Sequence, residues 1–459
     1  MKKEFDRTTF TLEERFKHIG EDKTYFIRTY GCQANVRDTE TIAGILEAMG
    51  FTLASRQEEA DFLLFNTCAV RRSAEEHVLG EIGKLKQLKL DYPNKVFGLC
   101  GCMAQEESVV EEIKQKYPQV DIIFGTHNLS NLPSILHEYY DQQAPLIKVE
   151  RTPGSIVEEL PTIRSQSYKA FINIMYGCNK FCTYCIVPYT RGRERSRQKQ
   201  HILEEINAFK TQGGKEIILL GQNVNAYGKD LGEEDGFTDL LRDCAETGID
   251  RIRFYTSHPR DYSSTSIDVM KEYPNIMNSL HLPVQSGSNE VLRRMARGYT
   301  VEHYKSLFDE MKEKIPSLTF TTDIIVGFPG ETDEQFEETL KLAEYCKYDL
   351  AYTFIYSPRE GTPAAKMEDD IPLKVKKERL QRLNELIAKY SNEKNQAYLD
   401  QELLVLCEGP SKKNKKVYSG YSEENKLVNF TGDNIQAGEI VKVKITGTKS
   451  YTLDGEKVI

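Results

Sequence analysis

The most constraining feature of this chain is a run of three cysteines, Cys178, Cys182 and Cys185, in a C-x₃-C-x₂-C spacing. A [4Fe–4S] cluster takes one protein ligand per iron and normally uses four cysteines. A loop that offers three thiolates therefore leaves one iron open to a ligand that is not protein. A structural zinc site is the alternative, but zinc favours four N or S ligands from paired C-x₂-C knuckles. No second knuckle follows this loop.

Length and composition indicate a cytosolic protein of two to four domains. The 459 residues exceed what a single core usually supports. The amino terminus is polar and charged, unlike a signal peptide, and no apolar stretch has the length needed to cross a bilayer. We therefore expect a cytoplasmic location without a membrane partner, and we expect the ten cysteines to be metal ligands or buried thiols rather than disulfides.

One segment of this acidic chain is strongly basic. The net charge of −9 argues against a protein that coats nucleic acid non-specifically. Residues 163–200, however, carry eight basic side chains against one acid, Glu194. A charge run is often only a solvated face, but this one begins beside the cysteine loop and favours a phosphate-binding rim. The candidate RNA-binding arginines are Arg191, Arg193, Arg195 and Arg197.

The apolar patterns divide the chain into three folded parts. Residues 22–140 alternate short apolar runs with helical periods, which is typical of an open parallel α/β sheet. Residues 141–163 are polar and form the expected linker. Residues 164–396 contain six predicted strands with helices between them, which indicates a partial TIM-type (β/α)₆ barrel. The cysteine loop follows the first of these strands, at the end where such folds place their chemistry.

The last part, residues 397–459, changes to short β patterns separated by turns. This pattern predicts a small antiparallel β-barrel of the OB type. Barrels of this kind often bind RNA. Because the charge of this part balances, RNA affinity would come from placed lysines, with Lys412 and Lys413 as the candidates.

Three further cysteines share one context in the first domain. Cys32, Cys68 and Cys102 each follow a predicted strand and precede a helix. The carboxyl ends of parallel strands converge on one crevice, so these thiols should meet in space. The alternative is that each is an ordinary buried residue, as free cysteine often is. The shared strand-end position favours a second cluster with an open iron.

The cysteine loop, with the aromatic Tyr184 before its last cysteine, resembles the signature of the radical S-adenosylmethionine (SAM) superfamily. Together with the second cysteine set and a terminal barrel similar to a TRAM domain, it makes the chain resemble the radical SAM methylthiotransferases. The resemblance covers residues from about 23 to 459. It implies two [4Fe–4S] clusters and SAM as cofactors. One SAM would yield a 5′-deoxyadenosyl radical, and another would methylate sulfur on the second cluster.

Within that family, the segments 31–35 and 178–197 look most like the enzymes that act on tRNA. The resemblance implies a transferase that converts N6-isopentenyladenosine next to the anticodon to its 2-methylthio derivative, although Ala34 stands where those enzymes usually have Met. The C2–H bond of adenine has no useful acidity, so a radical reagent suits it better than a general base. The implied partners are tRNA, a flavodoxin- or ferredoxin-type electron donor and a sulfur source.

Three alternatives stay open. Two are the substrates of neighbouring groups of the family: threonylcarbamoyl-adenosine in tRNA, and an aspartate of a ribosomal protein. A third possibility, of a different class, is a non-catalytic RNA-binding Fe–S protein that senses redox state. The open iron expected at the cysteine loop argues against this last alternative.

Candidate SAM contacts lie at the ends of later strands. Gly221 and Gln222 end the second barrel strand, where backbone carbonyls could hold the amino group of SAM. A basic side chain after the fourth strand could pair with its carboxylate. No catalytic residue beyond the cluster ligands is predicted. The full set of candidate SAM-binding residues is Tyr184, Gly221, Gln222, Ser286, Arg294 and Asp323.

Overall fold

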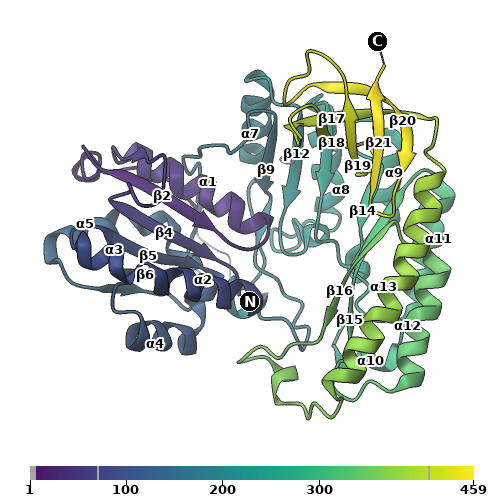
Figure 1. Cartoon of the computed structure of the whole chain (residues 1–459), viewed down its shortest axis with the longest axis horizontal. Coiled ribbons are helices and arrows are strands. Elements are labelled where there is room, and N and C mark those ends of the chain that lie inside the picture. Colours follow the sequence, from purple (N-terminus) through teal and green to yellow (C-terminus); the bar gives the residue numbers. More distant parts are fainter. Residues whose placement is uncertain (1–6, 70–71, 153, 412–413, 459) are drawn as a thin grey trace.

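The computed structural model describes residues 7–69, 72–152, 154–411 and 414–458. Figure 1 shows an amino-terminal layered α/β domain beside a larger central body, with a small β-barrel at the carboxyl end of the chain packed on that body. This arrangement matches the three folded parts expected from the sequence.

The amino-terminal domain is a six-stranded parallel sheet in the order β3-β2-β4-β5-β6-β7. All residues of β4 and β5 are buried, as expected of parallel strands covered on both faces. Helices α1 and α5 supply apolar side chains to the core on one face, and α2 and α4 to the core on the other. The strands are β2 (Thr24–Thr29), β3 (Thr52–Leu53), β4 (Phe62–Thr67), β5 (Val96–Gly101), β6 (Ile122–Phe124) and β7 (Leu146–Lys148). The helices are α1 (Gln33–Ala48), α2 (Arg72–Lys84), α3 (Lys86–Asp91), α4 (Glu107–Lys116) and α5 (Leu132–Gln142), with short 3-10 turns η1 (Glu14–Phe16), η2 (Cys102–Gln105) and η3 (Thr126–Asn131).

Strand pairing continues into the segment expected to be a linker. β7 pairs in parallel with β6 and completes the sheet, so the pairing of the first domain extends to Lys148. Further along, β8 (Ile156–Glu158) pairs in parallel with β1 (Arg7–Thr9). The connection between the domains is therefore tied to the start of the described chain.

The central body is the predicted partial barrel. Its six parallel strands form two three-stranded sheets, β9-β12-β13 and β14-β15-β16, and one continuous apolar core lies under both. The strands are β9 (Lys169–Asn173), β12 (Glu216–Leu220), β13 (Arg251–Phe254), β14 (Ser279–His281), β15 (Thr319–Val326) and β16 (Leu350–Ile355). The outer helices are α7 (Lys199–Thr211), α8 (Gly236–Glu246), α9 (Ser264–Glu272), α10 (Asn289–Arg294), α11 (Val301–Lys314), α12 (Asp333–Cys346) and α13 (Leu373–Gln396). Shorter elements are β10 (Met175–Tyr176), α6 (Val187–Thr190), β11 (Arg195–Ser196), η4 (Val224–Ala226), η5 (Pro259–Asp261) and η6 (Pro363–Lys366).

The carboxyl-terminal part is a closed five-stranded barrel in the order β17-β18-β19-β21-β20. Four of its pairings are antiparallel, and β19 with β21 is parallel. It docks on the amino ends of the central strands, where Arg251 donates to the carbonyl of Tyr421 at 2.9 Å and Arg253 to that of Ser422 at 2.6 Å. The small barrel therefore lies away from the strand ends that carry the cysteine loop. Its strands are β17 (Glu402–Pro410), β18 (Tyr418–Ser422), β19 (Leu427–Thr431), β20 (Ile440–Thr448) and β21 (Thr452–Lys457).

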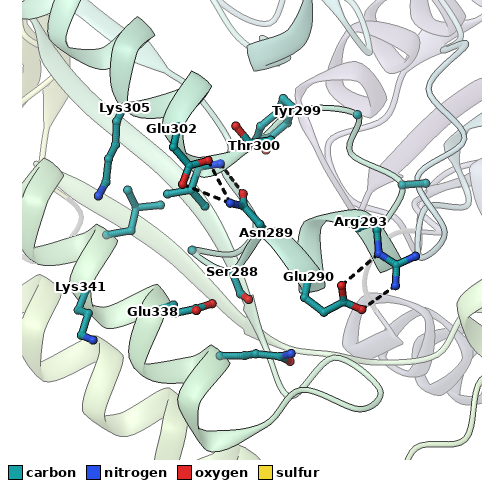
Figure 2. A pocket seen from close by; sticks show the side chains of 16 residues that line it. Ser288, Asn289, Glu290, Arg293, Tyr299, Thr300, Glu302, Lys305, Glu338 and Lys341 are labelled. Carbon is teal, nitrogen blue, oxygen red and sulfur yellow. Dashed lines mark hydrogen bonds and ion pairs between the residues drawn. The ribbon is translucent and has the colours of Figure 1, made fainter.

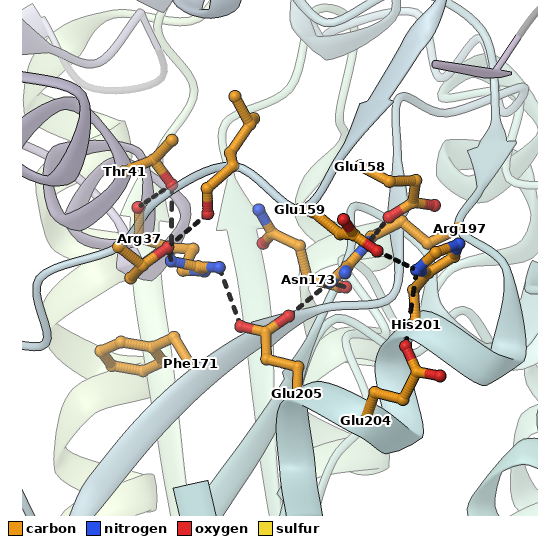
Figure 3. Close-up of polar contacts among 12 residues, drawn as sticks. Arg37, Thr41, Glu158, Glu159, Phe171, Asn173, Arg197, His201, Glu204 and Glu205 are labelled. Carbon is orange, nitrogen blue, oxygen red and sulfur yellow. Dashed lines mark hydrogen bonds and ion pairs between the residues drawn. The ribbon is translucent and has the colours of Figure 1, made fainter. Parts of the chain in front are cut away.

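A buried cluster of charges joins the first domain to the central body (Figure 3). The carboxylate of Glu205 on α7 accepts from Arg37 of α1 at 2.9 Å and from Arg197 at 2.7 Å, and it also pairs with Arg164. Burial alone would raise the pKa of Glu205, but the three guanidiniums lower it to about 2. One carboxylate on α7 thus binds α1 of the first domain and the segment that precedes β9.

Replacing Glu205 by alanine is expected to lower the free energy of unfolding by about 3–5 kcal/mol, because it leaves buried guanidiniums without their shared partner. Because the pKa of Glu205 is lowered, the wild-type contribution is present above its unfolded pKa and is lost as the pH falls towards 2. Urea unfolding followed by circular dichroism measures both effects. The exposed Glu204 is the matched control, and Glu204→Ala should change stability by less than about 0.5 kcal/mol. Equal losses in the two variants would contradict this role.

Candidate active site

Three cysteines of the first domain lie at the carboxyl ends of three adjacent parallel strands. Cys32 precedes α1 after β2, Cys68 follows β4, and Cys102 follows β5. Gly31 permits their approach: its φ is +138°, and a Cβ there would lie 2.5 Å from the Cβ of Cys68. A hydrogen bond with the Cys68 thiol lowers the pKa of Cys32 to about 5. The strand ends thus bring these three cysteines, called here the sheet trio, to the same edge of the sheet.

A buried arginine completes the surroundings of the sheet trio. Arg191 donates from Nε to the Sγ of Cys102 at 3.2 Å and from Nη2 to Asp38 at 2.7 Å. Its side chain is almost fully buried. A guanidinium in this position stabilises negative charge on sulfur, which is the form in which cysteine binds metal.

The other three cysteines, called here the loop trio, lie together between β10 and α6. Cys182 accepts from Nη1 of Arg297 at 3.5 Å, and the Sγ of Cys178 accepts from the backbone N–H of Lys180 at 3.4 Å. Burial raises the pKa of Cys178 and of Cys185 to about 12 each. These thiols therefore keep their protons near neutral pH unless a metal displaces them.

The backbone holds the cysteine loop against the segment that follows it. The N–H of Cys178 donates to the carbonyl of Gly192 at 3.0 Å, and β10 pairs with β11. Gly177 has a φ of +74°, and a Cβ there would lie 2.1 Å from the carbonyl oxygen of Arg193. Glu194 accepts from the backbone N–H of Asn179 at 3.1 Å and from its side chain at 3.0 Å. The loop is thus fixed before any ligand binds.

The two trios lie on facing sides of the domain interface. Ile186, the residue after Cys185, packs with Ala69 and Cys102 of the first domain. Nearby, the hydroxyl of Thr126 donates to the carbonyl of Thr190 at 2.7 Å. Arg191 belongs to the loop side of this interface and contacts the sheet trio directly. Two sets of candidate metal ligands are therefore brought close to each other by parts of the chain that are far apart in sequence.

The arginine run, predicted to be a phosphate-binding rim, is mostly buried. Arg191, Arg195 and Arg197 are almost fully buried, whereas Arg193 is exposed. Arg195 donates to the carbonyl of Arg191 at 3.2 Å, and Arg197 pairs with Glu158 at 2.7 Å as well as with Glu205. The expectation of four RNA-contacting arginines is therefore corrected, because three of these side chains are committed to contacts within the protein. Lys412 and Lys413 lie outside the described residues.

The candidate SAM-binding residues fall into two groups. Near the cysteine loop, Gln222 accepts from the N–H of Gly177 at 2.5 Å, and the carbonyl of Gly221 accepts from Thr256 at 2.7 Å. Tyr184 packs edge-on against Phe328, with ring centroids 6.5 Å apart. These positions fit a ligand bound beside the loop trio.

The other candidates are engaged within the protein. Arg294 donates to the carbonyl of Gly330 and to Gln335, both at 2.7 Å, and so braces the start of α12. Ser286 is fully buried. Asp323 lies 3.4 Å from the Nε2 of His281. The proposed pairing of Arg294 with a SAM carboxylate would require these contacts to break.

Sequence reasoning missed a group of polar residues at the strand ends. Arg297, three residues after the candidate Arg294, is the arginine that reaches the loop trio. After β12 and β13, within the described part of the chain, the buried atoms without a hydrogen-bond partner include both amide atoms of Asn225, Oγ of Ser257 and Nε2 of His258. A polar ligand would satisfy such atoms. Their only sequence signal is their position directly after predicted strands.

One surface pocket lies elsewhere, between α10, α11 and α12 (Figure 2). It has a volume of about 1070 Å³, and some of its polar side chains pair with one another. Arg293 pairs with Glu290 at 2.7 Å, and Asn289 donates to Glu302 at 3.0 Å. No cysteine lines it. The thiols of the two trios therefore lie outside this pocket.

Comparison with known proteins agrees with this arrangement. Residues 172–343 match the model of the Radical SAM superfamily, residues 24–125 that of the uncharacterized protein family UPF0004, and residues 396–458 that of the TRAM domain. The chain is thus a radical SAM protein with an amino-terminal α/β domain and a carboxyl-terminal TRAM domain. Membership of that superfamily implies a [4Fe–4S] cluster and SAM.

Full-length relatives give the family. The tRNA-2-methylthio-N(6)-dimethylallyladenosine synthase of Anoxybacillus flavithermus is 53% identical over 450 residues, which cover 98% of this chain and 85% of the relative. The synthase of the same name from Bacillus subtilis is 52% identical, covering 98% of this chain and 88% of the relative. The chain belongs to the tRNA-2-methylthio-N(6)-dimethylallyladenosine synthase family.

Solved structures share the fold at low sequence identity. A radical S-adenosylmethionine methyltransferase from Kitasatospora setae, with tryptophan and a SAM analogue bound, is 13% identical. The match covers 75% of each chain with a TM-score of 0.54.

Within the described residues, no helix combines the length and the apolar character that a membrane span requires.

Proposed function

We propose that this protein is a tRNA methylthiotransferase that converts N6-dimethylallyladenosine next to the anticodon to its 2-methylthio derivative. The observation that carries the proposal is the meeting of two cysteine trios across the domain interface, where Ile186 of the loop packs on Cys102. Radical chemistry alone needs one open cluster. A second set of three thiols beside it supports delivery of sulfur to the same place.

Both donor sets suit [4Fe–4S] clusters with one open iron, because each offers three thiols and no fourth. The proposed ligands are Cys178, Cys182 and Cys185 for one cluster, and Cys32, Cys68 and Cys102 for the other. When bound, these groups supply a one-electron route from SAM to a carbon radical and a site for methylated sulfur. A flavodoxin- or ferredoxin-type donor and a sulfur source complete the proposal.

The residues around the thiols have separate roles in this proposal. Arg297 and Arg191 donate to Cys182 and Cys102, so their positive charges would offset part of the negative charge of each bound cluster. The unpartnered polar atoms of Asn225, Ser257 and His258 would orient the polar groups of SAM. Gln222 fixes the cysteine loop through Gly177.

Product analysis tests the proposal. The anaerobically reconstituted protein is incubated with SAM, reductant and tRNA that carries N6-dimethylallyladenosine, and the digested nucleosides are analysed by mass spectrometry. We expect the 2-methylthio derivative, with 5′-deoxyadenosine formed alongside it. Parallel reactions contain tRNA with threonylcarbamoyl-adenosine or ribosomal protein. Product in either of those reactions alone would contradict the proposed substrate.

A further inference from the structure

A patch of exposed aromatic and basic side chains lies on the rim of the cysteine loop. Phe181 and Tyr189 keep 38% and 43% of their surface in solvent, and Arg193 is exposed beside them. The two rings meet edge to face with centroids 5.8 Å apart. The guanidinium carbon of Arg193 lies 4.5 Å from the centroid of the Phe181 ring. We call these three residues the rim patch.

The rim patch is held in place by backbone and by other side chains. The hydrogen bond from Cys178 to Gly192 positions the segment that carries Arg193 beside the loop that carries Phe181. Glu194 and Asn179 brace the same two segments from their side chains. The patch is therefore preorganised, and binding to it would order few additional groups.

The side chains of the rim patch are available to a partner. Among the ion pairs of the described residues, none involves Arg193, so its charge is not balanced by a neighbouring carboxylate. Three of the four arginines in the run are buried, so this exposed one contrasts with its neighbours. Two large aromatic rings lie exposed next to each other, beside a cationic group. Such a surface favours a flat ligand that carries negatively charged groups next to its ring.

We propose that the rim patch stacks a nucleobase that flanks the target adenosine of the tRNA. The inference rests on the proposed function and adds a substrate subsite to it. Aromatic side chains bind bases through their π-faces regardless of sequence, and an arginine adds cation–π attraction and charge for the phosphate backbone. Phe181 directly precedes Cys182, so a base stacked there lies beside the loop trio. The adenine that reacts passes this rim to reach the strand ends.

Binding of RNA by the reconstituted holoprotein tests the subsite. The probe is an anticodon stem-loop that contains N6-dimethylallyladenosine, followed by fluorescence anisotropy. Phe181→Ala and Tyr189→Ala are each expected to weaken binding by about 10- to 100-fold. Phe181→Leu keeps the apolar volume without the ring and should weaken it comparably. Iron content equal to that of the wild type shows that each variant has kept its clusters.

A matched control residue lies on α12, outside the candidate active site. Tyr345 of α12 is 48% exposed, and the ammonium of Lys305 lies 4.6 Å from its ring centroid. Tyr345→Ala removes an exposed aromatic ring from a cation–π pair that lies outside the candidate active site. It should leave RNA affinity within about twofold of wild type. A loss equal to that of Phe181→Ala would overturn the inference.

Stacking itself is measured with 2-aminopurine in place of the base next to the target. The wild-type protein is expected to quench the fluorescence of 2-aminopurine on binding. With Phe181→Leu, most of that fluorescence should remain. Unchanged quenching and affinity in the variant would overturn the subsite. So would unchanged RNA affinity with slower reduction by a flavodoxin-type protein, which would make the rim patch a protein-docking face. Stacking without any methylthio product in wild type would instead contradict the proposed function and leave the subsite standing.

Discussion

Replacing Cys182 by alanine should abolish the reductive cleavage of SAM. Cys182 is the central thiol of the loop trio and is held by Arg297. Two thiolates cannot hold three irons of a cubane, so the cluster that cleaves SAM would be lost. Formation of 5′-deoxyadenosine after anaerobic reduction, measured by liquid chromatography, should fall to the level found with SAM and reductant alone.

The control for this variant is a cysteine of the barrel core. Cys244 on α8 is fully buried among apolar side chains and belongs to neither trio. Cys244→Ala is expected to lower stability by about 1 kcal/mol and to keep 5′-deoxyadenosine formation near the wild-type rate. Continued cleavage of SAM by the Cys182 variant would defeat the assignment of the loop trio.

Replacing Cys68 by alanine should separate the two halves of the reaction. Cys68 belongs to the sheet trio, where its thiol forms the hydrogen bond that lowers the pKa of Cys32. Without it, the cluster proposed to carry sulfur is lost, whereas the loop trio on the barrel is untouched. Mass spectrometry of digested tRNA should find no 2-methylthio derivative, while 5′-deoxyadenosine still forms at a substantial rate.

Cys100 provides a close comparison for Cys68. It lies in β5, two residues before Cys102, and packs fully buried in the core of the sheet. Cys100→Ala should therefore keep the methylthio product, apart from a loss of stability of about 1 kcal/mol. Equal loss of product in both variants would show that the product depends on the folding of this sheet and not on a ligand set.

The placement of the cysteines could be predicted because it follows from strand topology. Parallel strands converge at their carboxyl ends, so cysteines after three such strands had to approach one another. The same reasoning put the loop trio at the end of the first barrel strand. The preference for Cys102 over Cys100 as a ligand stays a prediction, and the structure places Cys100 within β5 and in the core of the sheet.

The environment of the arginines could not be predicted in this way. Their acidic partners, Asp38, Glu158 and Glu205, lie up to 153 residues away in sequence, and local charge counting does not include them. The charged run therefore gave the expectation of a phosphate-binding rim, whereas tertiary pairing buries most of it. Arg297 was missed for the same reason, since its contact with Cys182 spans 115 residues.

Two short strands also could not be predicted from the sequence. β7 has three residues and β8 has three, which is too few for a periodic pattern to emerge from a polar segment. β8 pairs with β1, which is distant in sequence, and β7 pairs with β6, which is already paired with β5 on its other side. The segment therefore resembled a linker, although its backbone completes one sheet and begins another.

Iron and acid-labile sulfide per chain, measured on the anaerobically reconstituted protein together with its EPR spectrum, decide whether two trios of thiols each hold a cluster. Two cubanes require about eight irons and eight sulfides per chain. The Cys68 variant and the Cys182 variant should each retain about four irons and four sulfides. About four irons in the wild-type protein, all lost in Cys182→Ala and none in Cys68→Ala, would contradict the account.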